Sequence, residues 1–123
     1  FVVRNLNSQA LIVQERDFSV SLVSPKEGVL WKQNLNEEVI GDVRQIDYYK
    51  NGKLQYLITT KSKIHLIDRL GRYVTGFPKT IKEGVQFLSV VDYDKSKNYR
   101  YLVSTAGKNS IHLFDKDLNN LDD

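Results

Sequence analysis

Two histidines, His65 and His112, occupy matching places in two similar stretches of the sequence. Imidazoles repeated in this way could converge on a channel and bind a metal ion, but such a site needs three or four ligands that meet at one point. Equivalent positions in two repeats lie on different sheets. We therefore interpret both histidines as hydrogen-bonded structural residues.

Oxygen-bearing side chains alternate along a second stretch, in the manner of loops that bind calcium. Calcium takes six to eight oxygen ligands, commonly with a closing acid. Here Arg100 stands at the next alternate position, the central glycine is missing, and the preceding repeat has no such set. We expect a plain hairpin turn, and no metal or organic cofactor. The alternating residues are Asp92, Asp94, Ser96 and Asn98.

Hydroxyl and aromatic side chains are the remaining candidates for chemistry. Thr59–Thr60 and Ser104–Thr105 supply hydroxyls without a nearby acid–base partner in the sequence. Threonine is common in strands, so we interpret these hydroxyls as structural. Tyr48, Tyr49 and Tyr93 combine an aromatic ring with a polar tip, which suits a binding interface and sheet packing equally.

The composition is that of an ordinary globular chain, with 41% hydrophobic and 27% charged residues. The formal charge of +3 comes from 18 basic and 15 acidic residues whose signs alternate over short distances, so we expect no nucleic-acid partner. No apolar run approaches the roughly 18 residues of a membrane span, and we expect no direct membrane insertion. The absence of cysteine excludes disulfides, thiolate metal sites and a cysteine nucleophile.

The elements that position these side chains follow a repeated plan. Leu54–Pro78 contains three short apolar runs, rich in valine, isoleucine, tyrosine and phenylalanine, which polar turns separate. Such runs are typical of antiparallel strands. Nearly the same plan recurs in Tyr99–Asp115 and in Ala10–Trp31. The sequence therefore predicts an all-β fold built from repeated β-meanders.

The repeat has a measurable period. Tyr56 and Tyr101 are 45 positions apart, and His65 and His112 are 47 apart. The two-residue difference falls in the loop Gly107–Asn109, where an insertion is tolerated easily. A period near 45 is usual for the four-stranded blades of a β-propeller.

A fainter copy precedes these two. Leu11–Ile12 lies 46 positions before Leu57–Ile58, and Leu22–Val23 lies 44 before Leu66–Ile67. We therefore predict about two and three-quarter four-stranded antiparallel blades of one propeller. Blade one covers residues 1–33 and is incomplete at its start, blade two covers 34–78, and blade three covers 79–123 and lacks its outer strand.

Several local expectations follow from turn chemistry. Asn51-Gly52 predicts a type I′ hairpin turn, because both residues tolerate a positive φ. Gly28 and Gly71 are expected in turns that need an unusual backbone. Phe18–Val23 alternates apolar and serine residues, which predicts a half-buried strand. Arg72–Thr75 is expected to form the outer strand of the second blade.

The outer hairpins resemble those of known propeller repeats. Leu22–Lys32 resembles the outer hairpin of quinoprotein-like and WD40-like β-propeller repeats, in which a glycine turn, here Gly28, precedes an apolar pair and a tryptophan, here Trp31. This resemblance implies that the tryptophan docks between blades. Gly76-Phe77-Pro78 is similar to the end of blades in large bacterial cell-envelope propeller proteins, which implies a periplasmic or outer-membrane-associated location. The second copy has Val74 in place of the tryptophan.

We expect a non-catalytic scaffold or protein-interaction module that belongs to a larger cell-envelope protein. Because fewer than three blades cannot close a ring, a partner protein or further blades of a longer chain should complete it. The alternatives are a quinoprotein-type cofactor-binding or enzymatic propeller and a carbohydrate-binding propeller. Candidate contacts on the rim loops are Asn34, Asn36, Glu37, Lys61, Lys63, Lys82, Glu83, Lys108 and Asn109, and candidate structural residues are Gly28, Trp31, Gly71, Phe77, His65 and His112.

Overall fold

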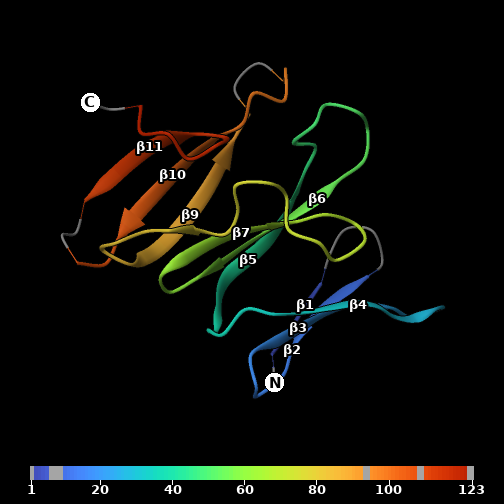
Figure 1. Cartoon of the computed structure of the whole chain (residues 1–123). Coiled ribbons are helices and arrows are strands. Elements are labelled where there is room, and N and C mark those ends of the chain that lie inside the picture. The colour runs from blue at the N-terminus through green and yellow to red at the C-terminus, as the bar shows by residue number, and fades with distance from the viewer. Residues whose placement is uncertain (1, 6–9, 93–94, 108–109, 122–123) are drawn as a thin grey trace.

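The fold is all-β, as the sequence predicts. The computed structural model describes residues 2–5, 10–92, 95–107 and 110–121, in which eleven strands form three separate antiparallel sheets and no helix occurs (Figure 1). Within these residues there is accordingly no helix long and apolar enough to cross a membrane.

The first sheet is a four-stranded meander. Its strands follow each other in space as in the sequence, and each pairs with the next in antiparallel orientation. They are β1 (Val2–Asn5), β2 (Leu11–Gln14), β3 (Ser19–Ser24) and β4 (Gly28–Asn34).

The second sheet repeats this order, but its outer strand lies later in the chain than expected. Arg72–Thr75 forms no strand, so that prediction is wrong; only Tyr73 makes an isolated bridge, to Ile67. The fourth position of the sheet is taken by Lys79–Thr80, which lies just past the expected boundary at 78. The strands are β5 (Val39–Ile46), β6 (Gln55–Thr60), β7 (Lys63–Ile67) and β8 (Lys79–Thr80).

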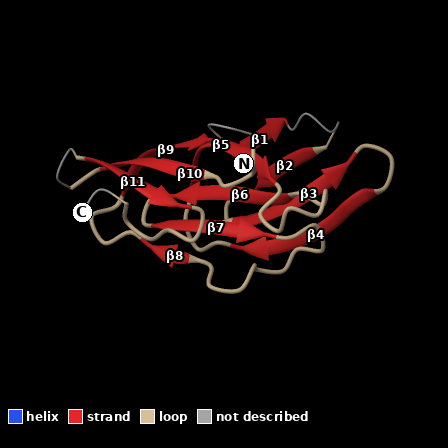
Figure 2. Ribbon diagram, turned by 90° about the horizontal axis from the view of Figure 1, so that it is seen from above, coloured by secondary structure: helices blue, strands red, loops and turns tan. Residues whose placement is uncertain are grey.

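The third sheet has three strands in the order β11-β10-β9. They are β9 (Val85–Val91), β10 (Arg100–Thr105) and β11 (Ile111–Asp115). Beyond them, Asn120 makes an isolated bridge to Phe114, in the same way that Tyr73 bridges to Ile67 in the second sheet. Seen from above, the second sheet lies between the first and the third (Figure 2).

The second sheet is buried on both faces. Because side chains of a strand alternate between faces, Tyr56 and Ile58 pack with the first sheet while Leu57 packs with the third. Strand β7 does the same, with Ile67 on one side and Leu66 on the other. The lack of apolar–polar alternation in these strands therefore reflects burial on both sides.

Strand pairing aligns the first copy differently from the sequence comparison. Ile12 corresponds to Leu57 at an offset of 45, so the offset of 46 is wrong. A shift of one residue would move each side chain to the opposite face of the sheet. Corresponding cross-strand pairs in the three sheets are Ile12–Leu22, Leu57–Leu66 and Leu102–Leu113.

Trp31 of the first sheet packs against the second sheet. Its side chain is 6% exposed, and its ring meets the edge of Tyr56 at a centroid distance of 5.7 Å. Gly71 lies against it so closely that a Cβ atom there would be 2.6 Å from Trp31 Cβ. The buried indole Nε1 has no hydrogen-bond partner within the described residues, so packing holds this side chain.

The turn before Gly71 recurs in the third sheet. The carboxylates of Asp68 and Asp115 each accept hydrogen bonds from the backbone amides two and four residues later. The third residue after each aspartate has a positive φ, which is 88° at Gly71 and 65° at Leu118. Gly71 therefore has the backbone conformation that the sequence predicts.

Two other local predictions are wrong. The positive φ angles of the β5–β6 loop occur at Lys50 and Gly52 rather than at Asn51 and Gly52, so there is no two-residue type I′ turn. The loop is longer because residues 47–54 are organised around the carboxylate of Asp47. Phe18–Val23 does not alternate between a buried and an exposed face: the serines of β3 at positions 19 and 21 are buried, as are Val20 and Leu22, while Phe18 is 41% exposed.

Two glycine substitutions separate backbone strain from the Trp31 contact. Gly28 has a φ of 83°, and a Cβ atom at this position would meet no other atom within 4 Å, so Gly28→Ala should destabilise by about 1 kcal/mol. Gly71→Ala adds a clash with Trp31 and should destabilise by roughly 2–4 kcal/mol. Urea unfolding of the two variants measures the difference. Equal losses of unfolding free energy in the two variants would mean that the contact between Gly71 and Trp31 adjusts to an added methyl group at little cost, and would contradict its role in holding the first two sheets together.

Candidate functional site

A buried polar network links the connection after the first sheet to the second sheet. Thr60 Oγ1 donates to Glu37 Oε1 at 2.7 Å and lies 2.9 Å from His65 Nε2. The Nδ1 atom of His65 is 2.8 Å from the hydroxyl of Tyr73. Ser62 Oγ donates to Glu37 Oε2 at 2.6 Å, so both carboxylate oxygens of Glu37 are engaged.

This network places a hydroxyl, an imidazole and a carboxylate together, and the interpretation of Thr60 as lacking an acid–base partner is wrong. Thr60 and His65 are only 0% and 1% exposed, so a substrate has no access to them. The carboxylate of Glu37 bonds to the hydroxyl and not to the imidazole, unlike the acid that orients the histidine in a nucleophilic triad. The arrangement connects sheet and loop.

His112 lies in a separate network on the third sheet. Its Nε2 atom is 3.0 Å from Ser110 Oγ, which in turn is 2.9 Å from Thr105 Oγ1. The two histidines therefore do not converge. No group of three metal-binding side chains occurs within the described ranges 10–92, 95–107 and 110–121.

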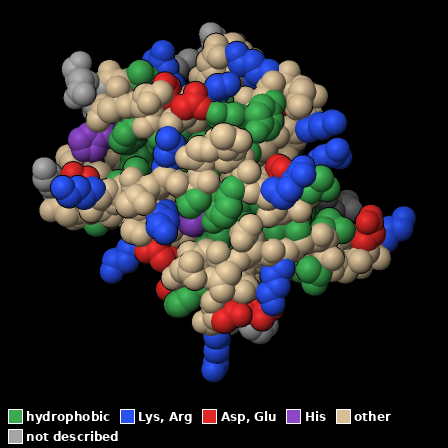
Figure 3. All heavy atoms as spheres, viewed as in Figure 1, with side chains coloured by type: hydrophobic (Ala, Val, Ile, Leu, Met, Phe, Trp, Pro, Cys, Tyr) green, Lys and Arg blue, Asp and Glu red, His purple; other side chains and the backbone are tan. Residues whose placement is uncertain are grey.

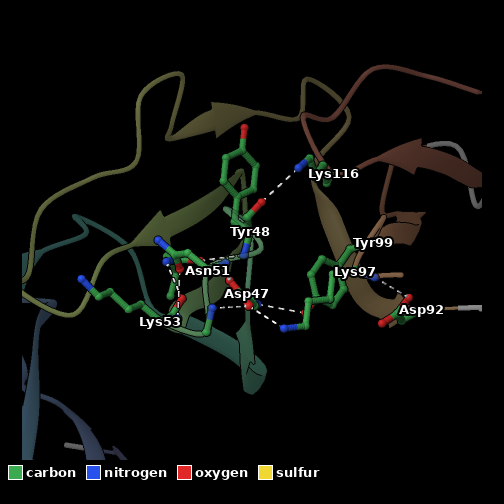
Figure 4. Close-up of polar contacts among 10 residues, drawn as sticks. Asp47, Tyr48, Asn51, Lys53, Asp92, Lys97, Tyr99 and Lys116 are labelled. Atoms are coloured by element: carbon green, nitrogen blue, oxygen red, sulfur yellow. Dashed lines mark hydrogen bonds and ion pairs between the residues drawn. The ribbon is translucent and has the colours of Figure 1, made fainter. Parts of the chain in front are cut away.

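A second polar network joins the second sheet to the third (Figure 4). Asp47 accepts a 2.7 Å hydrogen bond from Lys97 Nζ, together with hydrogen bonds from the backbone amides of Asn51 and Gly52. The backbone amide of Asp47 donates to the hydroxyl of Tyr99. The Lys97 bond, helped by the two amides, lowers the pKa of Asp47 to about 2 against the opposing effect of burial.

Tyr48 extends this second network. Its hydroxyl donates to Asp117, and its backbone oxygen accepts from Lys116 Nζ, which also lies 4.7 Å from the ring centroid. Burial, followed by the Asp117 contact, raises the pKa of Tyr48. Phe77, itself buried, meets the Tyr48 ring edge-on at a centroid distance of 6.2 Å. Tyr49, by contrast, is 53% exposed. Tyr93 lies outside the described residues.

The alternating oxygen-bearing residues that follow β9 form hydrogen bonds within the β9–β10 loop. Asp92 Oδ1 accepts a hydrogen bond from the backbone amide of Lys97, and Ser96 Oγ accepts from that of Asn98. Asn98 also accepts from Lys50 Nζ of the second sheet. Asp94 lies outside the described residues.

The predicted rim loops contact one another through their backbones. Val85 donates to the carbonyl of Lys61, and Gly107 donates to that of Glu83, so the three loops after β6, β8 and β10 form one continuous edge. Glu37 turns inward to Thr60 and Ser62. Exposed candidates are Asn34, Asn36, Lys61 and Lys82; half-buried ones are Glu37, Lys63 and Glu83; Lys108 and Asn109 lie outside the described residues.

The sequence analysis missed the contacts that cross between the second and third sheets. Asp47 and Asp92 are 45 positions apart and were recognisable as a repeated pair. The sequence gives no sign, however, that Lys97 of the third sheet pairs with Asp47 of the second sheet; only the structure shows this contact.

Comparison of the sequence with protein-family models and with curated proteins finds no match. The function is therefore argued from the residues and contacts described above.

The buried imidazole makes stability depend on pH. Burial, followed by the charge of Lys63, lowers the pKa of His65 to about 4, whereas an unfolded histidine titrates near 6.5. The stabilisation is thus fully present above pH 6.5 and is lost as the pH falls from there towards 4. Between pH 7 and pH 5 the free energy of unfolding should decrease by about 2 kcal/mol.

Urea unfolding of the wild type, His65→Gln and His112→Gln at these two pH values checks this dependence. His65→Gln should remove most of it, while His112→Gln should retain it. A wild type that is equally stable at both pH values would contradict the buried neutral state of His65.

The ion pair between sheets should matter more than an ion pair on the surface. The Asp47 side chain is 2% exposed and Lys97 is 44% exposed, whereas Glu15 and Lys32 form a 3.8 Å pair in which both side chains are about half exposed. Asp47→Ala leaves two backbone amides and Lys97 without their acceptor, so it should lower the thermal midpoint most. Lys97→Ala should lower it less, and Glu15→Ala should leave it near the wild-type value. Equal midpoints for the three variants would contradict the role of Asp47.

Proposed function

We propose that this chain is part of a non-catalytic β-propeller scaffold that binds a protein partner within a larger bacterial cell-envelope protein. The observation that carries the proposal is the common plan of the three sheets. Each is an antiparallel meander, and the second sheet packs face to face with both neighbours through two apolar clusters. Stacking of this kind, continued round an axis, is the architecture of a propeller.

The outer face of the third sheet supports the proposal further. Ile111 is 61% exposed, whereas its counterpart 47 positions earlier, Ile64, is 0% exposed beneath the third sheet. Apolar residues without cover on a sheet face indicate that another surface packs there. The third sheet carries the half-buried Leu102 and Leu113 and the exposed Ile111 where the second sheet fully buries Leu57, Ile64 and Leu66.

A non-catalytic role agrees with the polar networks. Thr60 and His65 are buried and Glu37, which is half-buried, has both carboxylate oxygens engaged, while the bonds of Asp47 and Tyr48 join one sheet to the next. These side chains rigidify the stack, and the loops at its ends remain available for recognition. The location in the cell envelope is supported by the likeness of Gly76-Phe77-Pro78 to the ends of envelope propeller blades.

Equivalent substitutions in the second and third sheets test the proposal. In residues 1–123, Ile64→Asn places an amide in a packed cluster and should destabilise by several kcal/mol, on the order of 3. Ile111→Asn should change the free energy of unfolding by less than about 0.5 kcal/mol and should reduce self-association through the open face. Urea unfolding and sedimentation velocity measure both effects.

The wild-type segment provides the control. It should oligomerise, aggregate or melt without cooperativity, because the apolar face of the third sheet is uncovered. A soluble monomer with one sharp transition, unaffected in its association by Ile111→Asn, would favour a smaller β-sandwich.

A further inference from the structure

A groove lies at the end of the second sheet where β6 begins, between the β5–β6 loop and the turn that follows β7. It has a volume of about 200 Å³. Three of its lining residues are cations, Lys53, Arg69 and Arg72, and one is an acid, Asp68. Lys61–Lys63 and the other predicted rim loops lie at the opposite end of the same strands.

Asp68 neutralises only one of the three cations of the groove, because its ion pair is with Arg72. Asp68 is engaged by its own turn, since it accepts hydrogen bonds from the backbone amides of Leu70 and Arg72 and from the Nε of Arg72 at 3.2 Å. Lys53 and Arg69 are exposed, and neither forms an ion pair within the described part of the chain. Figure 3 shows Lys and Arg side chains projecting at the upper right, on the side of the β5–β6 loop.

Apolar side chains adjoin these cations. Tyr49 and Leu70 line the groove and are 53% and 60% exposed, and Leu54, in the same loop as Tyr49, is 41% exposed. Tyrosine and arginine beside exposed aliphatic groups are typical of protein–protein binding sites. The groove thus offers both a charged and an apolar contact.

A neighbouring groove shows that this composition is not general. The groove of about 350 Å³ at the same end of the third sheet is lined by Arg100 and Lys116 but also by Asp115 and Asp117, so its charges balance. A nucleic-acid strand would need a continuous row of cations along its phosphates. The acids of the third sheet interrupt such a row, which favours a short peptide segment.

We propose that the groove of Lys53, Arg69 and Arg72 binds an acidic segment of a partner protein. Carboxylates of the segment pair with Lys53 and Arg69, and an apolar side chain of the segment packs between Tyr49 and Leu70. The inference deepens the proposed protein-binding role, but because the groove is formed by the second sheet alone, this binding does not depend on closure of a propeller ring.

Fluorescence polarisation tests the proposal with a fluorescein-labelled peptide in which glutamates flank a leucine and a phenylalanine. The wild-type chain should bind it, and the version with lysines in place of the glutamates should not bind. The double variant Lys53→Glu/Arg69→Glu should weaken binding by about tenfold or more. The matched control Arg16→Glu/Lys26→Glu makes the same charge change on exposed residues of the first sheet, outside the groove and outside the candidate rim-loop contacts, and should stay within about twofold.

Leu70→Ser provides a second variant that keeps the charge, and it should weaken binding severalfold. Circular dichroism verifies that each variant remains folded. Equal weakening by the two double variants would overturn the proposal in favour of unspecific attraction to the net charge. Tighter binding of single-stranded DNA of the same charge, or no binding of the acidic peptide by the wild type, would also overturn it.

Discussion

Burial of the second sheet on both faces is the constraint on which the rest of the structure depends. Strands β6 and β7 place apolar side chains on alternate sides, so the sheet is stable only when two further sheets cover it. The first and third sheets supply that cover. The contacts of Trp31 on one side and of Asp47 and Tyr48 on the other then fix where each neighbour lies.

The sequence was sufficient for the fold class because strand signals are local. Short β-branched and aromatic runs between turn residues predict strands, and their repetition predicts equivalent sheets. The alignment of one repeat with the next is harder to predict. Offsets of 46 and 45 match equally well in the sequence, but they place Ile12 on opposite faces of the sheet. The prediction of a type I′ turn at Asn51-Gly52 is wrong because the carboxylate of Asp47 binds the backbone amides of both residues and overrides the preference of the dipeptide.

The sites were less predictable than the strands. The bond from Lys97 to Asp47 spans 50 positions, and the groove at Lys53 and Arg69 forms from two turns that are separate in the sequence. Each of these turns taken alone indicates only a change of chain direction. Their juxtaposition follows from the sheet pairing of β6 with β7, which brings the start of one strand beside the end of the next.

The close approach of Trp31 to Gly71 also gives the repeats a fixed order. The positions equivalent to these two in the following interface hold Val74 and Leu118, which belong to one apolar cluster, so a large residue and a small one have exchanged sides. Leu118 shares the positive φ of Gly71, hence it is the volume of Trp31 that demands glycine at this point. The contact residues of each interface fit only each other. A designer who permuted or duplicated these repeats would therefore have to move Trp31 together with Gly71, or Val74 together with Leu118.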